Sequence, residues 1–307
     1  RRQVNQLAKP RLLTLVVNER SGGGRAGRML PKVARRLRDQ VPTAELHIIS
    51  SSSWSDAEKL TRAAALEARP GDALLVMGGD GMAHLGLNAA AGTDAVLGLI
   101  PAGTGNDFAR GVGVPRTVDE AVGAIVGGRT RTVDLTRISN GAFPQRYVGA
   151  VVSTGYDARV NRSTNRIRLR LGALSYGYVA LRELASFSPL NYEMVVDGEP
   201  RAQEAMLVAV ANTGLFGGGM RIAPDADPSD GLLDVTVIRT VSRGVLLRLL
   251  PSLYSGAFVR HPCVEQFRAR SIELAGPGLF VMGDGEELGE VPVRAECAPG
   301  ILKIFVA

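Results

Sequence analysis

Two glycine-rich turns, each directly after a short apolar run, constrain the fold of this chain most strongly. The run Ala73–Met77 is followed by Gly78–Gly81, and the run Ala95–Ile100 is followed by Pro101–Asp107. Neither run alternates apolar and polar residues, which is typical of strands buried on both faces of a parallel sheet. Since parallel strands need helical crossovers, the pattern predicts an α/β domain.

The composition of these turns indicates what they bind. Glycines at the carboxyl end of a strand let the backbone approach a ligand and point N–H groups at it. Two such turns on successive strands predict one phosphate-binding crevice. Asp80 and Asp107 would repel phosphate, so we expect a divalent cation beside them. The alternative is tight turns without a ligand, which explains less well the acidic residue in each turn and the presence of Thr104 and Asn106 in the second.

Composition limits the class of protein. The 307 residues, 45% hydrophobic and 21% charged, indicate a globular chain of two domains. A net charge of +6 favours acidic partners, namely nucleotide, nucleic acid or an anionic lipid surface. No apolar stretch approaches about 18 residues and the first residues are polar, so neither a membrane span nor export is expected, which predicts a cytoplasmic protein. Cys263 and Cys297 lack CxxC spacing and are expected to be buried thiols.

The chain is expected to divide into residues 10–136 and 137–307. The first part alternates apolar strands with amphipathic helices, which predicts a doubly wound α/β domain whose ligands lie at the carboxyl ends of the strands. Its expected strands are Leu12–Val17, Leu46–Ile49, Ala73–Met77 and Val96–Ile100. The second part is expected to be a mainly-β, sandwich-like domain with two helices. Its expected strands are Tyr147–Val152, Tyr192–Val196, Met206–Ala211, Asp234–Ile238, Ser271–Leu274, Leu279–Met282 and Ile301–Val306, and its helices lie near Leu169–Phe187 and Arg243–Phe258.

Taken together, Gly78–Gly81 and Pro101–Arg110 resemble the diacylglycerol kinase catalytic-domain family of soluble bacterial lipid kinases. This family includes sphingosine and ceramide kinases and is more distantly similar to NAD kinases. Three further segments fit the family's motifs, and they are Asn18–Gly22, Asn212 with Gly217–Asp234, and Asp284–Glu286. The resemblance spans nearly the whole chain and implies an active site in the cleft between the two domains.

This chain departs from the family's usual pattern at two turns. The family has Gly-Gly-Asp-Gly-Thr followed by an Asn-Glu pair, where this chain has Met82, His84 and Leu85. Glu19 stands where the family has a proline after Asn18. With this hydroxyl and carboxylate lost, backbone N–H groups are expected to hold the phosphates at the Gly78–Gly81 turn.

The resemblance implies ATP as the phosphate donor and assigns residues to it. The expected nucleotide holders are Asn18, Ser21, Gly22, Gly78, Gly79, Asp80, Gly81, Thr104 and Asn106. Ser51 or Ser52 lies where the family places a threonine that reaches the nucleotide, although the serine run could equally be a plain loop.

Phosphoryl transfer also needs a base for the acceptor hydroxyl. The resemblance makes Glu286 the general base and Asp284 the residue that orients it or holds a catalytic Mg²⁺. The alternative is a simple hairpin turn, since Gly-Asp-Gly is a common turn sequence and Glu287 and Glu290 make the segment acidic in any case.

A second Mg²⁺ site is implied around Asp230. In the family, the carboxylate at this position and neighbouring backbone carbonyls bind the ion, which assigns Asp227, Asp230 and Leu232. Waters on the ion would connect it to Asp80 and Asp134, an arrangement that suits Mg²⁺ because this ion keeps several waters. The alternative is a solvated acidic turn.

A cluster of arginines precedes the second-domain helix near Leu169–Phe187. Its members are Arg159, Arg162, Arg166, Arg168 and Arg170. Together with nearby leucines they could dock transiently on an anionic membrane surface, which would place the protein at the inner face of the membrane. A solvated basic face explains the same residues equally well.

The sequence thus favours a lipid kinase that uses ATP and Mg²⁺ to convert diacylglycerol to phosphatidic acid. Another lipid alcohol, such as a sphingoid base or a monoacylglycerol, remains an alternative acceptor. A nucleotide-binding regulator without catalysis is the alternative of a different class, and the intact Asp284–Glu286 motif argues against it. No GxGxxG after the first strand is accompanied by an acidic residue at the end of the second strand, which disfavours a dehydrogenase, and no nucleic-acid recognition motif is present. Exposed edges of the β-rich domain could pair two copies as a homodimer.

Overall fold

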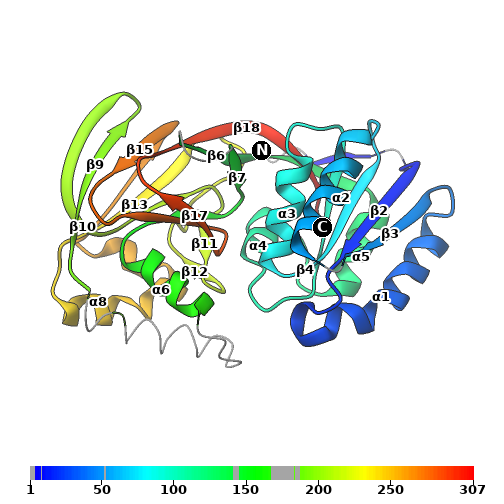
Figure 1. Cartoon of the computed structure of the whole chain (residues 1–307), viewed down its shortest axis with the longest axis horizontal. Coiled ribbons are helices and arrows are strands. Elements are labelled where there is room, and N and C mark those ends of the chain that lie inside the picture. The colour runs from blue at the N-terminus through cyan, green and yellow to red at the C-terminus, as the bar shows by residue number, and fades with distance from the viewer. Residues whose placement is uncertain (1–3, 8, 52, 141–144, 167–182, 184–186) are drawn as a thin grey trace. The chain divides into compact units, whose positions relative to one another are not determined.

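The computed structural model describes residues 4–7, 9–51, 53–140, 145–166, 183 and 187–307 (Figure 1). The chain separates into two compact units, one made of Arg1–Leu135 with Pro299–Ala307 and the other of Thr136–Ala298. The boundary near residue 135 lies next to the one expected from the sequence. The last residues differ from the expectation, because Pro299–Ala307 returns to the first unit. None of the described helices is long and apolar enough to cross a membrane.

The first unit is built on a parallel sheet with the order β3-β2-β4-β5. Its strands are β2 (Leu12–Val17), β3 (Glu45–Ser50), β4 (Ala73–Gly78) and β5 (Val96–Pro101), so the four predicted strands are confirmed with small shifts of their ends. Every residue of β4 and β5 is buried, whereas β3 at the edge is largely exposed. The end of β18 adds a further parallel pairing to β5, through Ile304 and Leu97.

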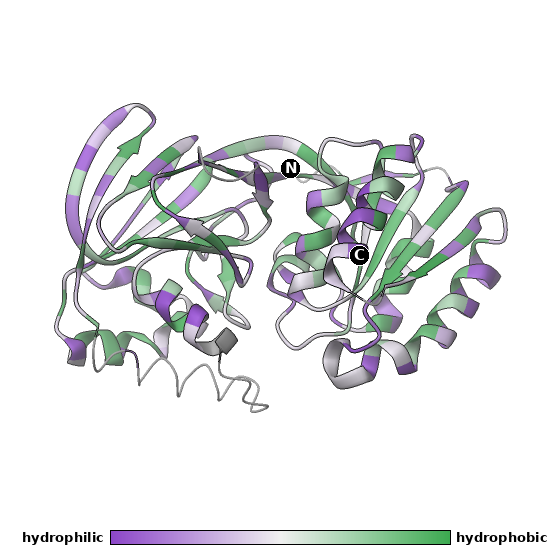
Figure 2. Ribbon diagram, in the orientation of Figure 1, coloured by the Kyte–Doolittle hydropathy of each residue, from purple (hydrophilic) through white to green (hydrophobic). Residues whose placement is uncertain are grey.

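Helices cover both faces of this sheet. They are α1 (Ser21–Gln40), α2 (Trp54–Glu67), α3 (Asp80–Ala90), α4 (Asp107–Val112) and α5 (Val118–Gly127). The close approaches of two helices identify the faces: Gly86 of α3 packs against Val76 of β4, whereas Ile125 of α5 packs against Gly98 of β5 close to Leu75. Since neighbouring residues of a strand point to opposite faces, α3 and α5 lie on opposite sides of the sheet. Apolar residues concentrate on the strands and the inward helix faces (Figure 2). This is the predicted doubly wound arrangement.

The chain passes between the two units inside two long strands, β6 (Arg129–Ser139) and β18 (Val293–Phe305). In the first unit, β1 (Val4–Gln6) pairs antiparallel with β6. The carboxylate of Asp134 on β6 accepts a hydrogen bond from the backbone N–H of Gly300 at 2.7 Å. This buried carboxylate fixes the C-terminal segment to the first unit.

The second unit is mainly antiparallel sheet, as predicted. Strand β10 is its centre and pairs with β8, β9 and β13. The other strands of the unit are β7 (Arg146–Val148), β8 (Val151–Ser153), β9 (Leu190–Val196), β10 (Glu199–Ala211), β11 (Leu215–Phe216), β12 (Met220–Arg221), β13 (Leu233–Arg239), β14 (Val264–Ala269), β15 (Ser271–Ala275), β16 (Phe280–Gly283) and β17 (Glu286–Glu290). Its core joins inward residues of these strands, such as Val208, Val235 and Ile272.

Several elements of the second unit differ from expectation. The predicted strand Tyr147–Val152 is interrupted at Gly149 and Ala150. The helix expected at Arg243–Phe258 is broken into α8 (Arg243–Leu249), α9 (Ser252–Ser255) and a 3₁₀ turn at Ala257–Arg260. The first break lies at Pro251, and α9 ends at Gly256, which has a positive φ of 77°. Helix α6 spans Tyr156–Arg166, and most of the helix expected near Leu169–Phe187 lies outside the described residues.

Candidate active site

Three turns of the first unit meet at the carboxyl ends of β2, β4 and β5. Gly22, with a φ of 60°, lies so close to the carbonyl of Ala102 that any side chain would collide with it. A Cβ at Gly103 would lie 2.5 Å from the Cα of Gly79. The glycines are therefore required by backbone contact between neighbouring turns. A small cavity of about 10 Å³ lies beside them, lined in part by Gly78, Gly79 and Asn106.

Asp80 ties two of these turns together. One carboxylate oxygen accepts the backbone N–H of Asn106 at 2.9 Å, and the other accepts that of Asp107 at 2.7 Å. These N–H groups begin α4, where a carboxylate is also stabilised by the helix dipole. Asp80 was expected to face a bound cation, which stays a prediction, and both of its carboxylate oxygens accept backbone N–H groups in the structure.

The other residues expected to hold nucleotide divide into two groups. Ser21 and Asn106 lie at the turns, Asn106 in the left-handed conformation with φ 56°, and the side chain of Asn18 accepts the N–H of Arg20. Gly81 lies in the first turn of α3 and Thr104 is exposed. Ser51 instead donates to the nearby carbonyl of Ser53, so its hydroxyl serves the loop before α2, and Ser52 lies outside the described residues.

The departures from the family's motif have a structural explanation at α3. Met82 is buried and its side chain packs directly against Gly78. His84 and Leu85 are also buried, and Asn88 donates to the carbonyl of His84. The apolar side chains of Met82 and Leu85 thus pack beneath the Gly78–Gly81 turn. The backbone N–H groups of the turn are then the groups that could donate to a phosphate.

The Asp284–Glu286 motif forms the tip of the β16–β17 hairpin in the second unit. Asp284 and Gly285 have positive φ values of 52° and 84°, as in a two-residue hairpin turn that favours Asp-Gly. The Asp284 carboxylate accepts the N–H groups of Gly149 and Ala150, each at 2.8 Å. Asp284 therefore fastens the tip of the hairpin to the segment at Gly149 and Ala150.

Asn212 completes this network from the other side. Its side-chain amide donates to the carbonyl of Gly149 at 2.9 Å, and its backbone N–H donates to the carbonyl of Ala150 at 2.8 Å. Gly149 and Ala150 are thus held through their N–H groups by Asp284 and through their carbonyls by Asn212. This explains why the predicted strand is interrupted there.

Glu286 is left exposed by this arrangement. Its neighbour Glu287 forms an ion pair with Arg162, whose guanidinium also stacks on the ring of Phe280. Within the part of the chain that the structure describes, the side chain of Glu286 forms no hydrogen bond or ion pair. Of the two consecutive carboxylates, only Glu286 is available to a substrate.

Replacing Asp284 by alanine is expected to lower the free energy of unfolding by about 3 kcal/mol, because two hydrogen bonds to a charged acceptor are lost and two N–H groups are left unpaired. Urea unfolding monitored by circular dichroism measures this change. Asp284→Asn keeps one acceptor oxygen and should fall between alanine and the native protein. Equal stability of all three proteins would show that the hairpin does not depend on this carboxylate.

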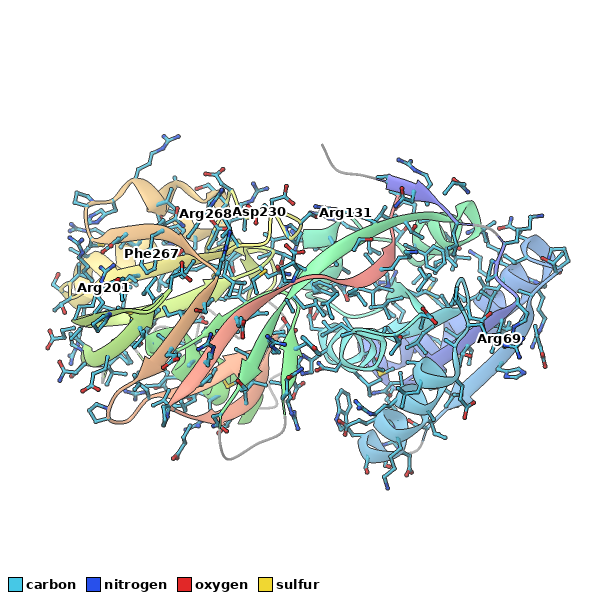
Figure 3. The ribbon with its side chains drawn as sticks, turned by 90° about the horizontal axis from the view of Figure 1, so that it is seen from above. Arg69, Arg131, Arg201, Asp230, Phe267 and Arg268 are labelled. Atoms are coloured by element: carbon cyan, nitrogen blue, oxygen red, sulfur yellow. The ribbon has the colours of Figure 1, made fainter. Side chains whose placement is uncertain are left out.

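The acidic loop before β13 holds Asp230, as shown from above in Figure 3. One of its oxygens accepts the N–H of Leu232 at 3.0 Å, and the other lies 3.6 Å from the guanidinium of Arg268. Arg268 also binds Asp234 at 3.2 Å. Burial raises the pKa of Asp234 above its ordinary value, and Arg268 opposes this shift. The sequence analysis did not identify Arg268, since no local pattern indicates which strand faces the loop.

This loop could bind Mg²⁺ only if water molecules and backbone carbonyls supplied most of the ligands. Across the described residues, no three Asp, Glu, His or Cys side chains converge on one point. An ion at Asp230 would complete its shell with carbonyls, such as those of Asp227 and Leu232, and with water, which Mg²⁺ tolerates. The carboxylates of Asp80 and Asp134 already accept backbone N–H groups.

Two arginines of the predicted membrane cluster are described, and both have acidic partners. Arg159 forms an ion pair with Glu183 at 3.0 Å, and Arg162 with Glu287. The side chain of Arg166 and the residues Arg168 and Arg170 lie outside the described residues. Because their charges are balanced by these carboxylates, Arg159 and Arg162 contribute less net positive charge to this surface than the sequence suggested.

Comparisons with known proteins place both units. Residues 12–138 match the model of the diacylglycerol kinase catalytic domain, and residues 150–306 match that of the YegS C-terminal NAD kinase beta sandwich-like domain. A diacylglycerol kinase of Mycobacterium tuberculosis is 38% identical over 296 residues, covering 95% of this chain and 94% of the relative. A diacylglycerol kinase of Bacillus subtilis is 28% identical, covering 77% of this chain and 78% of that protein.

Solved structures agree with this assignment of the fold. A crystal structure of a diacylglycerol kinase from Bacillus anthracis covers 98% of both chains with a TM-score of 0.74 at 22% identity. A second structure from the same organism has a TM-score of 0.79 at 25% identity. The predicted family and fold class are thereby confirmed. The chain belongs to the diacylglycerol kinase family and is a lipid kinase.

Proposed function

We propose that this lipid kinase transfers the γ-phosphate of ATP to the primary hydroxyl of diacylglycerol, giving phosphatidic acid. An apolar pocket in the second unit supports a lipid as the phosphate acceptor. The converging glycine turns of the first unit support a nucleotide as the phosphate donor. Backbone N–H groups at such turns suit phosphate because they bring partial positive charge without a bulky side chain.

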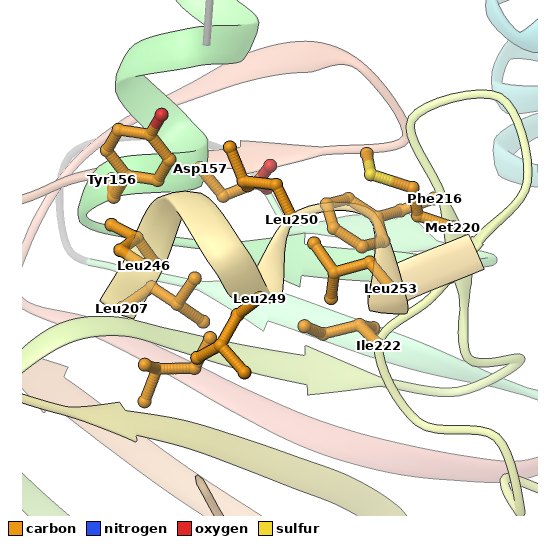
Figure 4. Close-up of a pocket in the computed structure, with 11 residues that line it drawn as sticks. Tyr156, Asp157, Leu207, Phe216, Met220, Ile222, Leu246, Leu249, Leu250 and Leu253 are labelled. Atoms are coloured by element: carbon orange, nitrogen blue, oxygen red, sulfur yellow. The ribbon is translucent and has the colours of Figure 1, made fainter. Parts of the chain in front are cut away.

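The apolar pocket lies under α8 and α9 (Figure 4). The cavity itself is small, about 20 Å³, because the apolar side chains around it pack closely. Its lining residues are Tyr156, Asp157, Leu207, Phe216, Met220, Ile222, Ile238, Leu246, Leu249, Leu250 and Leu253. Asp157 is the one acid among these lining residues, and burial raises the pKa of Tyr156, so its phenol stays neutral. Such a wall suits a hydrocarbon chain and offers little to a soluble sugar or nucleoside.

Glu286 supplies the base in this proposal. Its carboxylate takes the proton of the lipid hydroxyl while the hydroxyl oxygen forms a bond to the γ-phosphorus. The bond from that phosphorus to the β–γ bridging oxygen breaks, and ADP leaves. Availability of the carboxylate supports this role, because its neighbours Asp284 and Glu287 are occupied by other partners.

Mg²⁺ is the proposed cofactor. Bound with the triphosphate, it would neutralise charge on the phosphate oxygens. Asp230 is the proposed protein ligand, together with backbone carbonyls of its loop. Arg268 lies 3.6 Å from this carboxylate. Because the substrate resides in a bilayer, we also propose that the enzyme works peripherally at the inner face of the membrane.

The test is transfer of radiolabelled phosphate from ATP to a panel of lipid alcohols in mixed micelles. We expect diacylglycerol to be the preferred acceptor and labelled phosphatidic acid the product, with chelation of Mg²⁺ abolishing transfer. Preference for a sphingoid base or a monoacylglycerol would keep the lipid kinase and replace the acceptor. Absence of transfer to every lipid tested would overturn the proposal.

A further inference from the structure

The segment from Thr240 to Val264 has an unusual charge and a two-sided structure. It contains Arg243, Arg248 and Arg260, and neither aspartate nor glutamate. Within it, α8 and α9 form the outer wall of the apolar pocket (Figure 4).

The inner face of the segment is buried against the second unit. Leu246, Leu249 and Leu253 are buried, and together with Leu250 they line the pocket. The spacing of three and four residues places these leucines on one side of the two short helices. This side is therefore committed to the second unit.

The outer face exposes large apolar side chains next to arginines. Leu247 is 43% exposed and Tyr254 is 49% exposed, which makes them two of the few large apolar residues on the described surface. Arg243 and Arg248 are exposed on the same helix. The described part of the chain gives neither arginine an acidic partner, and Glu265, the next acid along the chain, is paired with Arg201 and Arg239.

We propose that this outer face, defined by Arg243, Leu247, Arg248, Tyr254 and Arg260, docks on an anionic lipid bilayer. The arginines would bind lipid phosphates while their stems lie along the interface, and Leu247 would enter the acyl boundary. Tyrosine has an apolar ring and a polar hydroxyl, which suits the headgroup level. This inference rests on the proposed function for its choice of partner, because the substrate of that function resides in a bilayer and the small apolar cavity lies behind the same two helices.

The charge of the segment favours a bilayer over a protein partner. Anionic headgroups attract basic residues without requiring matched geometry, whereas a protein partner needs a larger apolar surface than these two side chains supply. The paired arginines on α6 lack this property, since Arg159 and Arg162 already have acidic partners. The membrane contact is thus placed on α8 and α9, away from the arginines that the sequence singled out.

The test is sedimentation of the full chain with phosphatidylcholine vesicles, with and without phosphatidylserine, in the absence of ATP. Replacing Arg243 and Arg248 together by alanine should weaken binding to phosphatidylserine vesicles by about 25-fold, since each arginine near an anionic surface contributes about fivefold. Leu247→Ser with Tyr254→Ser should weaken binding by about fivefold through lost apolar burial. All four side chains are exposed, so the fold should be retained, which circular dichroism checks.

The matched control removes the same charge elsewhere. Arg35 and Arg38 are exposed on α1 of the first unit, and Arg35→Ala with Arg38→Ala should bind vesicles as the native chain does. Native binding by the α8 variant would overturn the docking surface. So would an equal loss in both double variants, since that result would indicate a general effect of net charge.

This test separates docking from catalysis. Vesicle binding is measured without turnover, so loss of binding in the α8 variant would support the docking surface even if no lipid were phosphorylated. Conversely, lipid phosphorylation with unaltered vesicle binding by the α8 variant would leave the proposed function in place and remove this inference.

Discussion

Glu286→Gln should lower kcat for lipid phosphorylation by about two to four orders of magnitude, the usual contribution of a positioned general base. The amide has the size of the carboxylate but cannot accept the proton of the lipid hydroxyl. Because the nucleotide turns belong to the first unit, the affinity for ATP should stay within a few-fold of native. Steady-state kinetics with labelled ATP and calorimetric titration of ATP measure the two quantities.

Glu287→Gln is the matched control for this substitution. Glu287 lies next to Glu286 on the same hairpin and is engaged by Arg162. Its neutralisation removes a surface ion pair worth about 0–1 kcal/mol and should leave kcat within a few-fold of native. If Glu286→Gln retains native turnover, or if both variants lose it equally, then Glu286 is not the base.

Asp80→Ala should unfold the connection between the two glycine turns and abolish ATP binding. Two N–H groups at the start of α4 lose a charged acceptor, which costs about 3 kcal/mol of unfolding free energy. For a unit of this size we expect the midpoint of thermal unfolding to fall by roughly 6–12 °C. Scanning calorimetry and ATP titration measure the two effects.

Asp94→Asn provides the comparison for charge alone. Asp94 is exposed in the loop before β5, so its replacement should change neither stability nor ATP affinity. Native stability of Asp80→Ala would contradict the role assigned to its two hydrogen bonds. A stable variant that loses only its response to Mg²⁺ would instead restore the cation explanation for Asp80.

The first unit was largely predictable, because its fold follows from local patterns. Continuous apolar runs such as β4 identify buried parallel strands, and the glycines after them mark the ligand edge of the sheet. The contact of Gly22 with Ala102 was not readable from the sequence, since it joins the turns after β2 and β5, which have β4 between them in the sheet. The sequence did not indicate that the C-terminal strand β18 pairs with β15 of the second unit and with β5 of the first, because its partners are far away in the chain.

The second unit was predictable in class and less so in detail. Alternating short strands indicated a β-rich unit, but the interruption at Gly149 and Ala150 depends on Asp284, which is 134 residues away from Ala150 in the chain. Likewise, Pro251 and Gly256 indicate that a helix at Arg243–Phe258 should be broken. The sequence does not indicate the pocket that this segment covers. Both arise where residues distant in sequence meet.

By itself, the sequence determined the family, the two kinds of unit and the set of motif residues, because these depend on residue type and short-range spacing. Only the tertiary structure decided what each carboxylate does: Asp80 and Asp284 hold backbone N–H groups, Glu287 pairs with Arg162, and Glu286 stays available. A carboxylate's chemistry depends on which donors lie within about 3 Å of it, and those donors come from segments far apart in the chain.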